Sequence, residues 1–154
     1  MSFDYFVAVP AKAWPSSIAL QQAIDRFEYP VRLRDLSDGN FDAPTRELAV
    51  QFEGRPVIIE AEVEEAKDAD DPQSLFGYIA QAAVGTFAIQ NGDQFLTLTF
   101  RSDADEIRAG LYIAAALING FGGYGFENQT ESHGRADFAA QMVREASNEN
   151  LWID

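Results

Sequence analysis

One histidine, three regularly spaced glycines and a run of carboxylates are the residues of this chain whose types could carry chemistry. The histidine, His133, stands beside Ser132 and close to Asp137. A Ser-His-Asp site requires three side chains that converge from separate parts of a fold, with the base able to reach the hydroxyl. Adjacent residues of one polar connection do not meet that requirement. The pattern therefore predicts an exposed loop histidine at a helix start, and we expect no catalytic residue.

The spacing of a dinucleotide-binding fingerprint is met by Gly120, Gly122 and Gly125. That fingerprint needs its glycines after a strand and at the start of a helix, where pyrophosphate meets the positive helix end. Here the glycines follow a stretch without charge, from Ala109 to Ile118, so they end a helix and lie at its negative end. We expect a helix stop with a tight turn, and no cofactor.

A short acidic run, Asp68, Asp70 and Asp71, has the spacing of the start of a calcium loop. An EF-hand loop continues with glycine at its sixth position and glutamate at its twelfth. Counted from Asp68, those positions hold Gln73 and Ile79. We therefore expect no metal site.

The composition bounds the class of protein. The chain has 154 residues, with 25 acidic and 11 basic side chains, a formal charge of −14 and no cysteine. This length fits one domain over residues 1–154. The acidic balance disfavours nucleic acid and anionic membranes and favours a basic partner. Without cysteine there is no disulfide framework, and without a basic leader we expect a cytoplasmic protein.

The stretch Ser102–Gly123 is the element around which we expect the fold to be built. Asp103 is a candidate N-cap, and Glu106 follows three residues later, as in a capping box. The body of the stretch is apolar around nearly its whole circumference, which is typical of a buried helix. It is shorter than the about 20 apolar residues of a membrane span.

The remaining elements predict an α+β fold with about four helices over a mixed, mainly antiparallel sheet. Two further helices are expected: one with Leu20 and Ile24 on its buried side, ending at Pro30, and one capped by Asp71. The other expected elements are three strands and a last amphipathic helix, at Asp4–Val9, Val31–Leu36, Tyr124–Asn128 and Arg135–Ser147. Their order suggests two ferredoxin-like α/β halves.

Two β-hairpins are predicted from turn chemistry and alternation. The first turns at Gly54-Arg55 and pairs Phe52 with Val57, which puts its apolar residues on one face. The second turns at Asn91-Gly92, a strong short hairpin signal, and pairs Phe87 with Leu96.

Carboxylates gather on the other face of the first hairpin. In the predicted register, Glu60, Glu62 and Glu64 share this face, and Glu47 stands opposite Glu62. The predicted partner-binding set adds residues of the neighbouring strand and the following linker: Glu47, Glu53, Glu65, Asp68, Asp70 and Asp71. Two interpretations stay open, a solvated face that keeps the protein soluble and a docking surface for a basic partner. Neutralisation of this face by arginines would weaken the second; the candidates are Arg32, Arg34 and Arg46.

Some segments resemble a family of small uncharacterised bacterial α+β proteins. In the first half these are Ala23-Ile24-Asp25, Tyr29 to Leu33 and the glycine turn before Val57 to Glu60. In the second half they are the helix from Ala114 to Leu117 and Gly122 to Gln129, where relatives tend to read Asp-Pro-Gln and this chain has Glu127-Asn128-Gln129. The resemblance implies no catalytic residue. It implies that such proteins are encoded near secreted or polymorphic toxins and act as immunity proteins.

Three functional hypotheses follow. The leading one is a non-enzymatic cytoplasmic immunity protein that occludes a basic toxin or enzyme. The second is a small-molecule-binding domain or minor enzyme with a pocket between sheet and helices, lined by Tyr78, Tyr112 and Tyr124. The third is a homo-oligomer joined through a sheet edge or the apolar tail around Trp152, so the protein is expected to be a monomer or a homodimer.

Overall fold

The structure is a computed structural model that describes residues 2–152, with side chains up to Asn150. This part of the chain forms seven strands and four α-helices, with two short 3-10 helices, η1 and η2. In chain order the elements are β1 (Phe3–Val9), η1 (Ala11–Ala13), α1 (Ser17–Arg26), β2 (Val31–Leu33), β3 (Glu47–Phe52), β4 (Arg55–Glu65), α2 (Leu75–Ala82), β5 (Gln94–Phe100), α3 (Ala104–Phe121), β6 (Tyr124–Glu127), β7 (His133–Gly134), α4 (Ala136–Ser147) and η2 (Glu149–Trp152).

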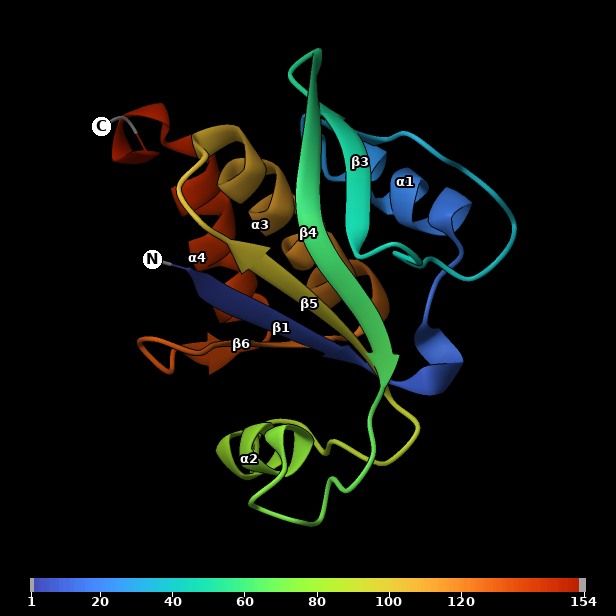
Figure 1. Ribbon diagram of the computed structural model, residues 1–154, viewed down its shortest axis with the longest axis vertical. Helices are drawn as coiled ribbons and strands as arrows, with labels where there is room; N and C mark the ends of the chain where they lie inside the picture. The colour runs from blue at the N-terminus through green and yellow to red at the C-terminus, as the bar shows by residue number, and fades with distance from the viewer. Residues whose placement is uncertain (1, 153–154) are drawn as a thin grey trace.

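All seven described strands form one sheet, in the order β2-β3-β4-β5-β1-β6-β7. Every neighbouring pair is antiparallel. Helices α1, α3 and α4 lie behind the sheet in Figure 1, and α2 lies apart from them at the lower end. The α+β class is therefore confirmed. The described pairs are all antiparallel, where a mixed, mainly antiparallel sheet was expected, and the two ferredoxin-like halves stay a prediction.

The predicted central helix is confirmed as α3. The Asp103 carboxylate accepts a hydrogen bond from the backbone N–H of Glu106 at 3.0 Å, and Gly122 ends the helix with a left-handed φ of 71°. Its residues from Ile107 to Ile118 are all buried against the sheet and α4. Near-complete burial follows from the missing polar stripe, since no side of this helix gains from contact with water.

The first hairpin forms with a register two residues away from the predicted one. Its loop is Glu53-Gly54, with φ values of 51° and 82°. Two successive positive φ values give a type I′ turn, whose twist matches that of the flanking strands. Val50 therefore pairs with Val57, and Glu47 stands opposite Glu60 instead of Glu62. A shift of two keeps every side chain on its predicted face, because the side-chain period of a strand is two.

The second hairpin is wrong, although its turn exists. Gly92 has the φ of 96° that a turn requires, but the residues before it form no strand. Strand β5 instead pairs with β4 on one side and β1 on the other, and α2 lies in the long β4–β5 connection. Phe87 stacks on the Tyr124 ring at 5.7 Å, so it is partly buried against the smaller apolar cluster instead of lying in a strand pair.

Helix α2 covers only one end of the second face of the sheet. Phe76 and Ile79 of α2 pack with Phe95 and Tyr124 of the sheet in a smaller apolar cluster. The helix begins later than predicted, because Ser74 and not Asp71 accepts from the backbone of its first turn, at the N–H of Gly77. Within residues 2–152, no helix is long and apolar enough to cross a membrane.

The outer edge of the sheet at β2 is closed by one side chain of α1. The buried Gln21 amide donates to the carbonyl of Val31 at 3.1 Å and accepts from the N–H of Leu33 at 2.6 Å. It thus replaces a further strand and satisfies edge groups that could otherwise pair with another chain. Strands β1 and β2 flank α1 in the chain, but β3, β4 and β5 lie between them in the sheet.

Candidate functional site

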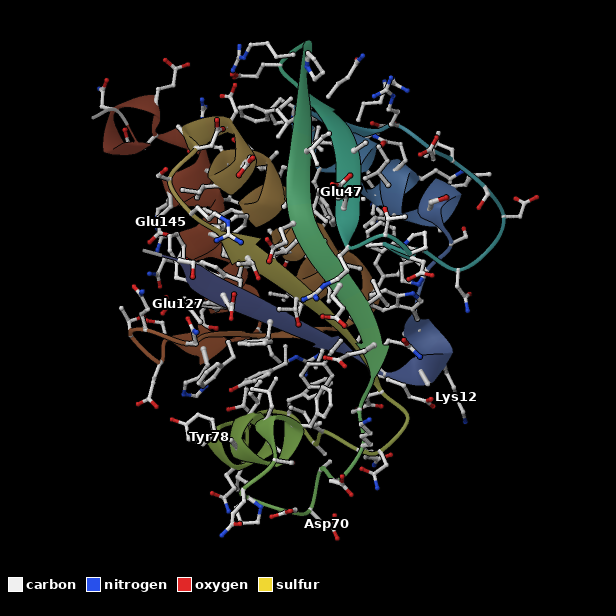
Figure 2. All side chains as sticks on the ribbon, viewed as in Figure 1. Lys12, Glu47, Asp70, Tyr78, Glu127 and Glu145 are labelled. Carbon is white, nitrogen blue, oxygen red and sulfur yellow. The ribbon has the colours of Figure 1, made fainter. Side chains whose placement is uncertain are left out.

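The face of the sheet that α1, α3 and α4 leave uncovered carries two rows of polar side chains beside α2. We call it the open face and define it by Glu47, Ile58, Glu60, Glu62, Glu64, Thr97, Thr99 and Asp4 with the flanking Phe6 and Phe126. Antiparallel register places Glu60, Thr99 and Asp4 in one row across β4, β5 and β1. The next row holds Glu62, Thr97, Phe6 and Phe126. In Figure 2, Glu47 lies toward the upper end of this face and Tyr78 of α2 toward the lower end.

The predicted partner-binding residues separate into two groups. Strand alternation and register bring Glu47, Glu60, Glu62 and Glu64 together on the open face. The other five lie elsewhere: Glu53 in the hairpin loop, Glu65 one residue past Glu64 and so on the opposite side, and Asp68, Asp70 and Asp71 in the loop before α2. Figure 2 shows Asp70 beyond α2, away from the sheet.

Arginines compensate part of the negative charge on the open face. Arg101 binds Glu60 at 2.7 Å, which relieves the repulsion between Glu60 and the opposing Glu47. Arg46 lies 3.4 Å from Glu62, with 71% of its side chain exposed. Among the described residues, Glu64 has no ion pair within 4 Å. Burial and the neighbouring Glu62 both raise the pKa of Glu64.

Two connected depressions hollow the open face. The groove, of about 350 Å³, runs along α2 between Glu62 and Glu64 on one side and Asp4 and Tyr78 on the other. A shallower basin of about 570 Å³ continues past Glu60 toward Glu47 and Ile58. Six carboxylates and two guanidinium groups line the two together: Asp4, Glu47, Glu60, Glu62, Glu64 and Glu106, with Arg46 and Arg101.

Three large apolar side chains are exposed along the same surface. Ile58 is 52% exposed in the basin, and Leu75 and Tyr78 are each 46% exposed beside the groove. The sequence patterns missed this combination. Thr97 and Thr99 share one side of β5 because side chains alternate along a strand, but only the strand order brings them and Asp4 beside the glutamates.

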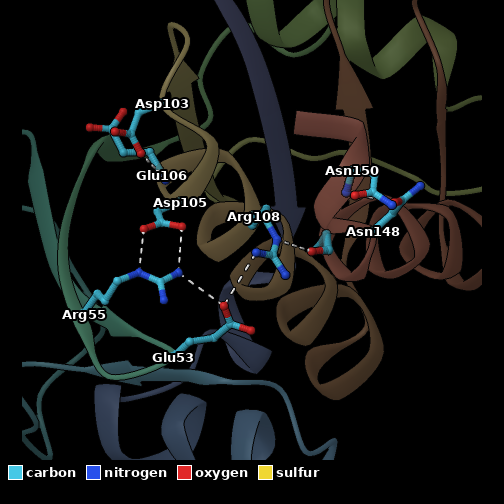
Figure 3. Close-up of polar contacts among 9 residues, drawn as sticks. Glu53, Arg55, Asp103, Asp105, Glu106, Arg108, Asn148 and Asn150 are labelled. Atoms are coloured by element: carbon cyan, nitrogen blue, oxygen red, sulfur yellow. Dashed lines mark hydrogen bonds and ion pairs between the residues drawn. The ribbon is translucent and has the colours of Figure 1, made fainter. Parts of the chain in front are cut away.

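Glu53 serves the fold at the tip of the first hairpin, as Figure 3 shows. Its carboxylate lies 3.2 Å from Arg55 and 3.6 Å from Arg108. Arg55 in turn binds Asp105 of α3 through two hydrogen bonds of 2.9 Å. The network ties the β3–β4 loop to the first turns of α3, so Glu53 is committed to a structural contact.

Replacement of Asp105 by asparagine is expected to reduce stability in a pH-dependent way. The hydrogen bond from Arg55 holds the pKa of Asp105 below its ordinary value of 3.8. A carboxylate with a depressed folded-state pKa stabilises the fold above the unfolded value and loses that contribution as pH falls through the folded value. At about pH 7 the cost of Asp105→Asn should be up to about 1 kcal/mol. Unfolding midpoints of both proteins, measured down to about pH 3, should begin to converge below pH 3.8; a constant difference would contradict this assignment.

The other residues considered for chemistry have structural surroundings. The ring nitrogen Nδ1 of His133 lies 2.7 Å from the hydroxyl of the buried Tyr124, whose pKa burial raises to about 12. Asp137 accepts from the N–H groups of Arg135 and Phe138, and Ser132 contacts Thr130. The three members of the Ser-His-Asp pattern are thus engaged separately, and His133 lies in a short strand, β7, instead of a loop.

The three tyrosines proposed as pocket lining are also separated. Tyr78 lines the groove, Tyr112 is a buried residue of α3 on the other face, and Tyr124 of β6 is buried beneath α2. The described part of the apolar tail is the backbone of Leu151 and Trp152 in η2, and Ile153 lies outside the described residues.

Comparisons of the chain with protein-family models, with curated proteins and with solved structures found no match.

Proposed function

We propose that this chain is a non-enzymatic cytoplasmic binding protein that acts as an immunity protein, covering a basic toxin or enzyme with its open face. The observation that carries the proposal is the line of Glu47, Glu60, Glu62 and Glu64 across a sheet face that the large helices leave bare. A basic partner would meet complementary charge over the groove and the basin together.

The exposed apolar residues give this surface the mixed character of a protein interface. Interfaces combine apolar anchors at the centre with polar and charged groups that fix orientation. Ile58, Leu75 and Tyr78 supply candidate anchors within the acidic surface. The formal charge of −14 would also attract a basic protein over a distance and speed association.

The resemblance to small bacterial proteins supports a toxin as the basic partner. It is carried by segments that include Tyr29 to Leu33 and Gly122 to Gln129. Cation-rich toxins that act on nucleic acid need Lys and Arg at their active surfaces, since these residues displace phosphate counterions. A carboxylate-rich face would compete with nucleic acid for these Lys and Arg residues.

The test compares the wild-type protein with the triple variant Glu60→Lys, Glu62→Lys and Glu64→Lys. We expect the wild type to bind a basic protein of the native host whose expression arrests growth, and to relieve that arrest. The triple variant should bind it at least about tenfold more weakly, because three attractive contacts become repulsive.

The matched control carries the same charge change away from the open face, at exposed positions: Asp35→Lys, Asp38→Lys and Glu149→Lys. It should keep capture and growth relief, and circular dichroism should show both variants folded. Unchanged capture by the open-face variant, or loss with both variants, would contradict the proposal.

A second candidate is the binding of a small cationic molecule in the groove. It is favoured by the position of the groove between the sheet and α2, with Tyr78 and several carboxylates around it. In that case a small cation would bind and no basic protein would be captured.

A further inference from the structure

The groove beside α2 differs from the rest of the open face because the buried rings of Phe6 and Phe126 lie at its floor and the half-exposed Tyr78 forms one wall. Phe6 and Phe126 lie 6.5 Å apart between ring centroids, and Tyr78 meets the edge of Phe126 at 6.0 Å and 88°. Glu62, Glu64 and Asp4 stand around these rings. Aromatic faces and carboxylates attract the same kind of ligand, a cation with an apolar stem.

Glu62 and Glu64 are less compensated by arginine than Glu60, which lies where the groove meets the basin. Glu60 lies 2.7 Å from Arg101, but the only guanidinium among the described residues that line the groove is that of Arg46. Arg46 holds Glu62 at 3.4 Å from the rim, and 71% of its side chain faces solvent. A contact of that exposure is weak and easily exchanged for another cation.

We infer that the groove receives one arginine side chain of the basic partner, with its guanidinium between Glu62 and Glu64 and its aliphatic stem over Phe6 and Phe126. The inference rests on the proposed function and names the residue type that the site would recognise. Arginine suits it better than lysine, because a planar guanidinium binds carboxylates through paired hydrogen bonds and stacks on aromatic rings.

Size and charge agree with this occupant. A volume of about 350 Å³ is at the small end of sites that hold separate ligands, and it suits a single long side chain. The raised pKa of Glu64 reflects partial burial beside Glu62, and a cation placed between the two would offset both effects. The exposed Leu75 at the rim would contact apolar atoms beside the inserted arginine.

Arg46 would compete with the incoming arginine for Glu62. Its replacement by glutamine removes a positive charge from the rim and frees the Glu62 carboxylate. The Arg46→Gln protein should therefore bind an arginine probe more tightly than the wild type, whereas removal of a groove carboxylate should weaken binding. Opposite effects from two neighbouring residues would be hard to obtain from non-specific attraction.

The experiment follows backbone and side-chain NMR signals while acetyl-arginine amide or the neutral acetyl-citrulline amide is added. We expect millimolar binding of the arginine probe, with shifts concentrated at Phe6, Thr97 and Tyr78, and much weaker binding of the citrulline probe. Glu64→Gln should weaken the arginine probe about fivefold, as loss of one partly exposed charge contact would. Glu65→Gln is the matched control, since it removes the adjacent carboxylate from the opposite side of β4, and it should leave binding unchanged.

Equal shifts with both probes, or equal effects of Glu64→Gln and Glu65→Gln, would overturn the arginine site. If the wild type still captured a basic protein and the triple variant did not, the proposed function would stand without it. Spermidine tests whether the groove binds a free small cation and not an arginine side chain of a partner protein. Tighter binding of spermidine than of the arginine probe at the same residues, with no protein captured, would overturn both the arginine site and the proposed function.

Discussion

The Arg108→Ala protein is expected to unfold with a free energy about 3 kcal/mol below that of the wild type. Arg108 is 7% exposed, and its Nε donates to the carbonyl of Ala146 at 2.6 Å, which joins α3 to the end of α4. Its guanidinium also lies 4.8 Å from the centre of the Phe52 ring and 3.6 Å from Glu53. The substitution leaves a buried carbonyl without its donor and removes packing along the arginine stem.

Urea unfolding monitored by circular dichroism measures this loss. The matched control is Arg144→Ala, which removes an exposed arginine from the last turn of α4 and should change stability by less than about 0.5 kcal/mol. If Arg108→Ala cost less than about 1 kcal/mol, the contacts of Arg108 in Figure 3 would not hold the hairpin tip and the helix pair together.

Gly110→Ala is the second substitution with a large expected cost, about 2–3 kcal/mol in the free energy of unfolding. A Cβ at Gly110 would lie 2.3 Å from Cζ and 2.5 Å from Cε1 of Phe100. Phe100 is 0% exposed and belongs to β5, so its ring has little room to move away. The gain of up to about 1 kcal/mol that alanine brings to a helix interior is smaller than the cost of this overlap.

The same substitution at Gly120 is the control, because it lies in the same helix. Its Cβ would meet the Cβ of Ala23 at 3.3 Å, which a small local shift can accommodate. We expect Gly120→Ala to stay within about 1 kcal/mol of the wild type. Equal changes in stability at the two glycines in thermal unfolding would show that the close approach of α3 to β5 does not decide the result at Gly110.

The alternation of side chains along a strand predicted part of the open face. A strand period of two was enough to put Glu60, Glu62 and Glu64 on one side of β4, and the two-residue error in the hairpin register did not disturb this. Alternation gave no information about which strand lies next to β4. The pairing of β4 with β5, and of β5 with β1, places Thr97 and Asp4 in rows with the glutamates.

Sequence signals for the ends of helices were reliable, because each of these residue types has a specific role at a helix end. Asp103 and Gly122 bound the central helix because a carboxylate can accept from free N–H groups and glycine can adopt positive φ. The hairpin predicted from Asn91-Gly92 was wrong because this dipeptide is also only a local signal. It specifies a turn and not the partner of the strand that follows, and β4 and β1 offered β5 longer pairings than residues 86–90 could.

The sequence by itself determined the α+β class, the buried central helix, the side of β4 on which its glutamates stand and the excess of negative charge, because these follow from periodicity, capping and composition. Only the tertiary structure decided the order of the strands, the one-sided cover by α1, α3 and α4, and the groove beside α2 where Glu64, Phe6 and Tyr78 meet. Those features depend on contacts between residues far apart in the chain. Such contacts are chosen by the total area that the packed elements bury, which no local pattern contains.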